Sequence, residues 1–191
     1  MMLLEYEDFL LLREAANEST TAVITFGRMN PVTIGHRENM EALRITANEL
    51  HGTPLVFLSH SNDPKKNPLT YDQKVKYVTM AAPDGVEVIN TPASNMPDIF
   101  KELSKMGFTN VIVVVGEDRE VSFQNFKKYA KDFGLDSIDI ICSGERHPGV
   151  SGSDMRKFVK NGDYESFRKN SPLDDKNTRD MFNDVKKGLG L

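Results

Sequence analysis

The chain has 191 residues, a formal net charge of −4 and one cysteine. This length suits one well-packed domain and is short for two. The acidic balance argues against non-specific binding to nucleic acid and favours a small-molecule partner. A single cysteine excludes a disulfide within the chain, which suits a reducing, cytoplasmic compartment. No apolar run approaches the roughly 20 residues that span a bilayer, so we expect a soluble protein with no membrane contact.

The first 20 residues are expected to precede the domain as a separate element. Residues 1–16 mix leucine and phenylalanine with charged side chains, which is typical of an amphipathic helix, and residues 17–20 form a linker. The segment lacks the basic start and the cleavage site of a signal peptide. Packing within the chain is the simpler expectation, and packing on a second subunit, as in a homo-oligomer, stays open.

Short apolar runs alternate with amphipathic stretches through the rest of the chain. We predict strands at 21–26, 53–60, 86–90, 111–115 and 138–142, and helices at 37–50, 71–82, 98–106, 123–133 and about 150–160. This alternation predicts a Rossmann-like, doubly wound parallel α/β sheet of about five strands with helices on both faces. We assign it to residues 21–170 and treat residues 171–191 as a C-terminal helical tail.

The turn after the first predicted strand carries the most informative motif. Residues 26–36 read FGRMNPVTIGH. We expect Gly27 to adopt a backbone conformation closed to other residues, and Gly35 to leave room where the next helix exposes unpaired N–H groups. Such a turn is a phosphate site, to which His36 adds an imidazole donor and Thr33 a hydroxyl. An ordinary turn with a helix-capping histidine is the plainer alternative.

Two further loops follow predicted strands, at the edge of the sheet where ligands of such folds bind. After the second strand, Lys65 or Lys66 is a candidate phosphate ligand, and a solvated lysine pair is the alternative. After the fourth strand, Gly116 leads into Asp118, which can accept from a ribose hydroxyl, and Arg119, which can contact a phosphate. A salt-bridged surface pair explains these last two residues equally well.

The last loop leads into residues 150–156, VSGSDMR, which open a helix. Ser151 or Ser153 can cap this helix, and its free N–H groups attract anions. Arg156 lies three residues after Ser153, on the same helical face, and can bind a phosphate through two donors. A plain N-cap with a solvated arginine is the alternative.

These segments resemble the T/HxGH nucleotidylyltransferase superfamily. Residues 33–36, TIGH, lie within its longer pattern G-x-[FM]-x-P-x-[TH]-x-G-H, and residues 150–156 match [IV]-S-x-[ST]-x-x-[RK]. The loop at 62–74 is similar to those of phosphopantetheine and nicotinamide mononucleotide adenylyltransferases. The motifs, with V-G-x-D-R and S-G-E-R later, also look like the cytidylyltransferase-like proteins of large tailed bacteriophages, whose location would be the host cytoplasm.

The resemblance implies an enzyme that transfers a nucleoside monophosphate from a triphosphate to a phosphomonoester and releases pyrophosphate. AMP from ATP is favoured over a CTP-dependent reaction, and Mg²⁺ is expected to accompany the triphosphate. The catalytic residues that it implies are His36, Thr33, Lys65 and Arg156. The nucleotide-binding residues that it implies are Gly27, Arg28, Met29, Asn30, Gly35, Gly116, Asp118, Arg119, Val150, Ser151 and Ser153.

The acceptor is the least determined part of this interpretation. The patterns G-R-M-N-P and V-S-G-S-x-x-R favour nicotinamide mononucleotide, whereas Thr33 and the lysine loop favour phosphopantetheine. Arg28 is a candidate to hold the acceptor, and Glu117, Asp118 and Phe123 can meet a cationic ring. The four histidines show no metal-ligand spacing. A non-catalytic nucleotide-binding scaffold is the alternative of another class.

Overall fold

The computed structural model describes residues 20–116, 123–142 and 150–191. The predicted N-terminal helix lies outside these residues, as do Glu117, Asp118 and Arg119. None of the helices within the described ranges is long and apolar enough to cross a membrane.

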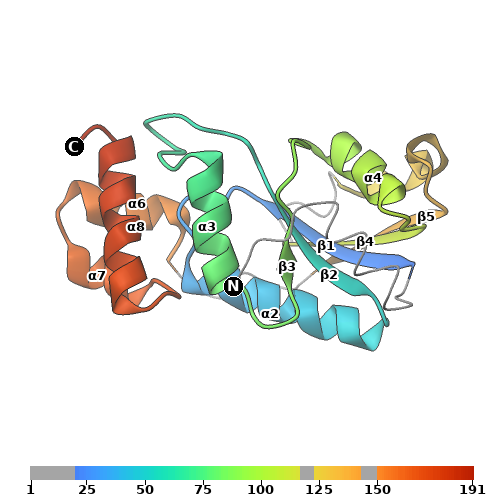
Figure 1. Ribbon diagram of the computed structural model, residues 1–191, viewed down its shortest axis with the longest axis horizontal. Coiled ribbons are helices and arrows are strands. Elements are labelled where there is room, and N and C mark those ends of the chain that lie inside the picture. Colours follow the sequence, from blue (N-terminus) through green and yellow to red (C-terminus); the bar gives the residue numbers. More distant parts are fainter. Residues whose placement is uncertain (1–19, 117–122, 143–149) are drawn as a thin grey trace.

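A parallel sheet of five strands forms the centre of the domain (Figure 1). The strands are β1 (Thr21–Gly27), β2 (Thr53–Leu58), β3 (Glu87–Val88), β4 (Asn110–Val115) and β5 (Ser137–Cys142), in the order β3-β2-β1-β4-β5. Every pair of neighbours is parallel. The order reverses between β1 and β4, so a crevice for ligands is expected beyond their carboxyl ends. The predicted doubly wound α/β sheet is therefore confirmed.

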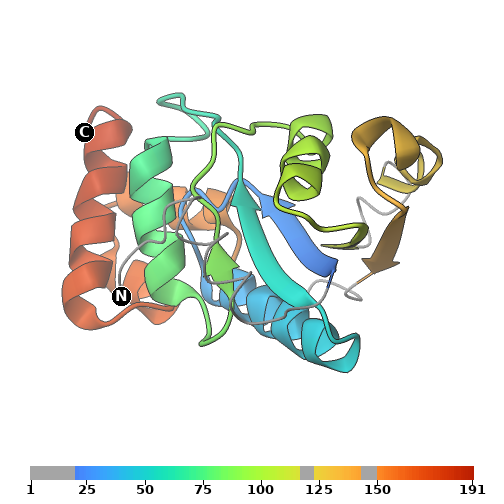
Figure 2. The same ribbon diagram turned by 45° about the vertical axis from the view of Figure 1, so that its right-hand side comes forward.

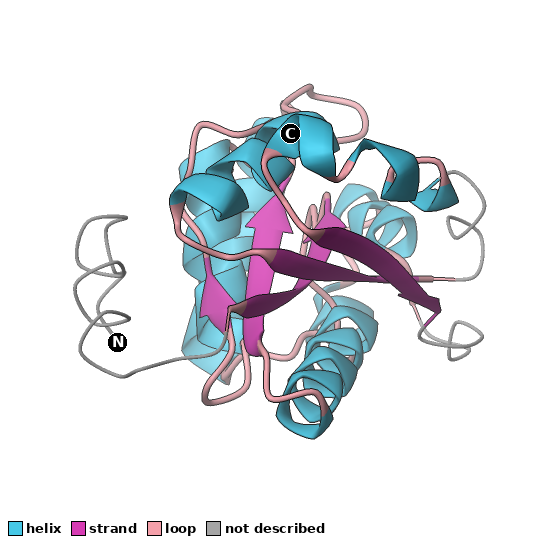
Figure 3. Ribbon diagram, turned by 90° about the vertical axis from the view of Figure 1, so that its right-hand side faces the viewer, coloured by secondary structure: helices cyan, strands magenta, loops and turns pink. Residues whose placement is uncertain are grey.

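Helices cover both faces of this sheet (Figure 3). The helices are α2 (Ile34–Glu49), α3 (Tyr71–Ala81), α4 (Met96–Lys105), α6 (Gly152–Lys160), α7 (Tyr164–Lys169) and α8 (Asp175–Gly188). Successive residues of a strand face opposite sides, so Val23 packs with α2 and α3 while Ala22 and Ile24 pack with α4. The last three helices gather beside α3 at one end of the molecule (Figures 1 and 2).

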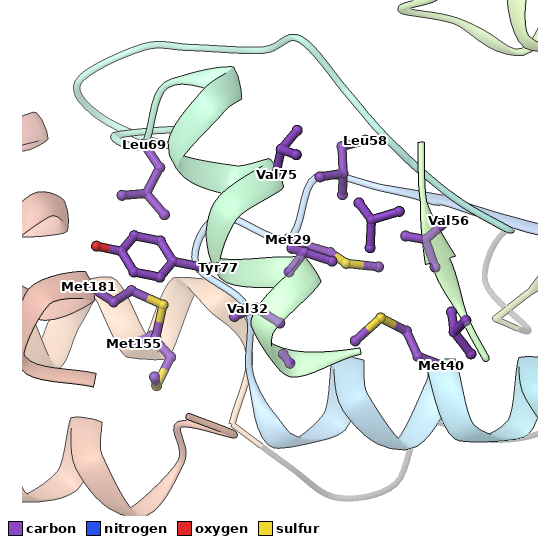
Figure 4. Packing of buried hydrophobic residues seen from close by; sticks show 14 of the residues in the cluster. Met29, Val32, Met40, Val56, Leu58, Leu69, Val75, Tyr77, Met155 and Met181 are labelled. Carbon is purple, nitrogen blue, oxygen red and sulfur yellow. The ribbon is translucent and has the colours of Figure 1, made fainter. Parts of the chain in front are cut away.

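Four methionines join these C-terminal helices to the core. Met29, Met40, Met155 and Met181 come from the turn after β1, from α2, from α6 and from α8, and all are buried (Figure 4). Met155 and Met181 lie beside the Tyr77 ring of α3, whereas Met29 and Met40 lie further along the cluster, toward Val56 of β2, and their flexible thioethers fill irregular space in this core. Residues 171–191, expected as a tail, thus contribute buried side chains to the same core as α2 and α3.

One predicted helix is wrong. Within the segment expected to be helical at 123–133, residues 123–124 are α-helical and the rest includes two short 3-10 turns, Lys127–Tyr129 and Lys131–Phe133. The Phe126 and Phe133 rings, which flank and end these turns, contact Phe100 of α4, with ring centroids 5.5 and 5.3 Å from that of Phe100. The segment therefore packs on α4 through aromatic rings without forming the continuous helix that its spacing predicted.

Candidate active site

In the turn after β1, the residue with a left-handed backbone conformation is not the glycine for which it was predicted. Gly27 ends β1 and lies outside the left-handed region, whereas Met29 adopts a φ of 40°. The conformational expectation for Gly27 is therefore wrong. The left-handed conformation costs about 1–2 kcal/mol for a residue with a side chain. Burial of the Met29 side chain, worth about 1.5–3 kcal/mol, offsets this strain.

His36 and Thr33 form a capping box at the start of α2. The Thr33 hydroxyl accepts from the His36 N–H at 3.3 Å, and the Thr33 N–H donates to His36 Nδ1 at 3.1 Å. A backbone amide can only donate, so Nδ1 accepts and the neutral imidazole carries its proton on Nε2. The half-buried His36 is thus a helix cap whose ring carries its N–H on Nε2.

The first turn of α2 keeps one open backbone donor. The Ile34 N–H donates to the Asn170 carbonyl at 3.1 Å, and the His36 N–H is taken by the cap. Within the described ranges, the Gly35 N–H has no hydrogen-bond partner. A Cβ at Gly35 would have the Thr33 hydroxyl, at 3.8 Å, as its nearest contact, so the start of α2 is not crowded at this residue.

Asn30 fastens the turn to the loop after β2. Its buried carboxamide accepts from the Leu69 N–H at 3.0 Å and donates to the Leu69 carbonyl at 3.1 Å. Its own backbone carbonyl accepts from Arg156 Nη1 at 2.6 Å. Asn30, which was predicted to bind nucleotide, therefore holds three segments of the chain together through its side chain and its backbone carbonyl.

The N-terminus of α6 meets this turn. Ser151 caps the helix: its hydroxyl accepts from the Asp154 N–H at 3.2 Å and donates to the Asp154 carboxylate at 2.6 Å. This hydrogen bond, with help from Lys157, lowers the pKa of Asp154 to about 2. A Cβ at Gly152 would lie 3.4 Å from the Asn30 carbonyl, so α6 begins directly against the first motif.

Arg156 bridges the two motifs. Besides the Asn30 carbonyl, its guanidinium donates to the Ser153 hydroxyl at 2.9 Å. Burial, and then the nearby charge of Arg28, lower the pKa of Arg156, and Asp63 and Asp154 oppose them. The exposed Arg28 and the half-buried Arg156 thus form a pair of neighbouring cations, which favours a polyanionic ligand.

The lysine loop folds around Asp63. Its carboxylate accepts from the N–H groups of Lys65, at 3.0 Å, and Lys66, at 2.7 Å, and from the Asn67 amide, which lowers the pKa of Asp63. Both lysine side chains are exposed. In the part of the chain that the structure describes, the Lys65 ammonium makes no hydrogen bond or ion pair, so its phosphate role stays a prediction.

Two further residues predicted to bind nucleotide, Gly116 and Val150, lie next to elements already described. Gly116 follows β4 directly, at the point where the strand order reverses, and Val150 packs against the core just before α6. Among the described residues, no group of three His, Cys, Asp or Glu could hold a metal ion. The acidic side chains near Arg156 are Asp63 and Asp154, which are engaged in a turn and in a cap.

Sequence reasoning missed a polar cluster at the ends of β2 and β3. Lys74 of α3 is fully buried, and its ammonium donates to the carbonyls of Ser59 and Ser61. The His60 ring stacks on Tyr71, with centroids 3.8 Å apart. The available signal was the position of Lys74, four residues before the buried Val78 on the apolar stripe of its helix.

A doubly wound sheet with two helix N-termini and two arginines at its carboxyl edge defines a nucleotide-binding α/β domain. The family model described as cytidylyltransferase-like matches residues 24–158. The chain therefore belongs to the cytidylyltransferase-like family and is a nucleotidyltransferase.

Two solved structures share this fold at low identity. A candidate nicotinate-nucleotide adenylyltransferase from Vibrio parahaemolyticus is 15% identical, with a TM-score of 0.59 over 84% of this chain and 98% of that one. TmcAL from Thermotoga maritima, bound with alpha-thio ATP, is 13% identical, with a TM-score of 0.52 over 89% of this chain and 56% of that one. No curated protein sequence matches the chain significantly.

Proposed function

We propose that the protein transfers AMP from ATP to a phosphomonoester, with nicotinamide mononucleotide as the favoured acceptor, and releases pyrophosphate. The observation that carries this proposal is the position of Arg156, which joins the start of α6 to the first motif and lies within reach of the charge of Arg28. One triphosphate can then meet both helix N-termini at once.

The reaction needs no nucleophile from the protein. An oxygen of the acceptor phosphate attacks the α-phosphorus, a new P–O bond forms, and the bond to the bridging oxygen of the β-phosphate breaks. Catalysis is then a matter of positioning and charge stabilisation. His36 Nε2–H and the Gly35 N–H would donate to the α-phosphate oxygens, where negative charge builds up.

The other residues have one of two roles: they bind the phosphates beyond the reacting phosphorus, or they position His36. Arg156 and the α6 N-terminus, with Ser153, would hold the β- and γ-phosphates, and Lys65 would approach the leaving pyrophosphate. Thr33 is a positioning residue, because its hydroxyl and amide hold the imidazole of His36. Mg²⁺ would neutralise charge on the phosphates, held by their oxygens.

The choice of substrates has independent support of different kinds. The favoured acceptor rests on the two motifs, and the candidate nicotinate-nucleotide adenylyltransferase of the same fold supports by its name an acceptor of the same chemical class, a pyridine mononucleotide. ATP is supported by the alpha-thio ATP bound to TmcAL. Phosphopantetheine as acceptor, or CTP as donor, is the second candidate, favoured by Thr33 and by the family description.

The test is release of pyrophosphate from each nucleoside triphosphate combined with a panel of phosphomonoesters. One matched pair is expected to give release well above the others. No release with any pair would overturn the catalytic proposal and leave a nucleotide-binding scaffold. Release with CTP only, or with phosphopantetheine only, would replace the favoured substrates and retain nucleotidyl transfer.

Substitutions at His36 separate its catalytic role from its capping role. His36→Ala removes the donor and the cap, and should lower turnover by about 100-fold, the scale for loss of one preorganised donor. His36→Glu restores the capping box, since glutamate is a common partner at this position, but supplies no donor. It should therefore unfold like the wild type and turn over no faster than His36→Ala. Exposed His51 provides the control substitution. Wild-type turnover in His36→Ala would refute the assigned role.

A further inference from the structure

Lys74 is a buried cation that the proposed reaction does not use. Its side chain is 0% exposed, and its ammonium donates to the Ser59 carbonyl and, at 3.2 Å, to the Ser61 carbonyl. In the described part of the chain no carboxylate forms an ion pair with it. A buried charge with no opposite charge costs several kcal/mol, and an apolar side chain of similar volume would serve packing as well or better. Packing alone therefore does not account for a lysine at this position.

The two carbonyls that Lys74 holds belong to the segment that leads from β2 into the lysine loop. The Ser59 N–H donates to the Gly27 carbonyl at 2.9 Å, so the residue held by the ammonium is also paired with the start of the first motif. Ser61 is the next fixed point along the loop. At the far end of the same loop, the Leu69 backbone is held by Asn30.

We propose that Lys74 is a positioning residue that fixes the start of the loop at 59–69 against the first motif, so that the exposed lysines of this loop lie beside the donor phosphates. The inference rests on the proposed nucleotidyl transfer. Lys74 acts through the carbonyls of Ser59 and Ser61 and does not touch substrate. Hydrogen bonds from one ammonium to two carbonyls fix both carbonyls relative to α3, which the stem of an apolar residue cannot do.

The test compares Lys74→Met, which keeps the stem and loses the donors, with Lys74→Arg, which keeps a charged donor. Exposed Lys76, two residues further along α3, gives the control Lys76→Met. KM and kcat for the triphosphate are measured by pyrophosphate release, and the Kd for ATP by calorimetry. Hydrogen exchange is followed in peptides covering 59–69 and, as a reference, β4 at 110–115.

Lys74→Met is expected to raise KM and Kd by about tenfold with a smaller change in kcat, the pattern for lost binding without lost chemistry. Protection should fall at 59–69 and persist in β4, and Lys74→Arg should recover part of both. Unchanged Kd, with protection lost equally in both peptides, would overturn the proposal in favour of a purely structural role. If Lys74→Met does not fold, the same measurements are made on Lys74→Gln, which keeps an amide donor. A raised Kd with protection lost only at 59–69 would support the proposal, and an unchanged Kd with equal loss in both peptides would overturn it.

The two proposals fail in distinguishable ways. A wild-type protein that binds ATP and releases no pyrophosphate would refute the reaction, while Kd and exchange in the Lys74 variants still decide the positioning role. A wild-type protein that binds no triphosphate would refute both. Turnover in the wild type with unaltered KM, Kd and loop exchange in Lys74→Met would refute the positioning role alone.

Discussion

Asn30→Ala separates a structural role of the first motif from a ligand-binding one. The substitution removes the acceptor of the Leu69 N–H, which is buried with Leu69 at 0% exposure. It also removes one donor to the Leu69 carbonyl, but Asn62 still donates there at 3.0 Å. One orphaned buried amide costs about 1–3 kcal/mol, so we expect a loss of about 2 kcal/mol in the free energy of unfolding. For a chain of this size that lowers Tm by roughly 4–8 °C.

The measurement is urea denaturation of Asn30→Ala, Asn62→Ala and the double variant. Asn62→Ala should cost less than about 0.5 kcal/mol, because Asn30 keeps the Leu69 carbonyl paired. The double variant should cost more than the sum by about 0.5–3 kcal/mol, since both donors to that carbonyl are gone. If instead Asn30 mainly binds nucleotide, Asn30→Ala would keep the wild-type Tm and lose ATP affinity. That result would refute the structural role.

Three further predictions follow from the packing and the charges. A Cβ at Gly188 would lie 2.0 Å from the Pro68 carbonyl oxygen, so Gly188→Ala should lose about 1–3 kcal/mol of unfolding free energy and protection in the adjoining loop. Gly190→Ala, with a φ of 76° and nothing within 4 Å, should strain only its own backbone, and equal loop exchange in both variants would contradict the contact. The folded pKa of Lys74, about 8, lies below its unfolded value, so the unfolded state binds more protons between about pH 8 and 10.4. In urea titrations, the free energy of unfolding of the wild type should therefore rise by up to about 3 kcal/mol relative to that of Lys74→Met as pH rises through this range. A difference in unfolding free energy that does not change with pH would disprove the burial of the charge. Arg156→Ala should weaken ATP binding more than AMP binding in calorimetry, and equal losses would place Arg156 away from the distal phosphates.

The position of the site could be predicted because it depends on local pattern. The first motif follows a strand and precedes a helix, and so it had to lie at the carboxyl edge of a parallel sheet. The cap of α6 was expected at Ser151 or Ser153, and the structure selects Ser151 because Asp154 completes the box. Hydrogen bonds between residues three apart are readable from sequence, since helix geometry fixes them.

The hydrogen bonds that hold the candidate site in place could not be predicted, because Asn30 and Lys74 make them to backbone groups far away in the sequence. Asn30 bonds to a residue 39 positions away, and Lys74 to carbonyls 15 and 13 positions away. Every residue carries a backbone carbonyl, so no residue type marks Ser59 or Leu69 as a partner. The left-handed turn at Met29 was missed for a related reason, since the burial that offsets its strain comes from a core cluster whose members lie far apart in the sequence.

A series of contacts links the C-terminal helix α8 to the candidate site, although α8 contributes no residue to that site. Gly188 of α8 packs on Pro68, and the Tyr77 hydroxyl of α3 donates to Asp184 of α8 at 2.6 Å. The residue after Pro68 is bonded twice to Asn30, whose carbonyl holds Arg156. Each contact in this series fixes the backbone that carries the next one. We therefore expect a shift of α8 by the width of a methyl group to move Arg156 before it moves the sheet, whose strands are held by their own hydrogen-bonded ladders.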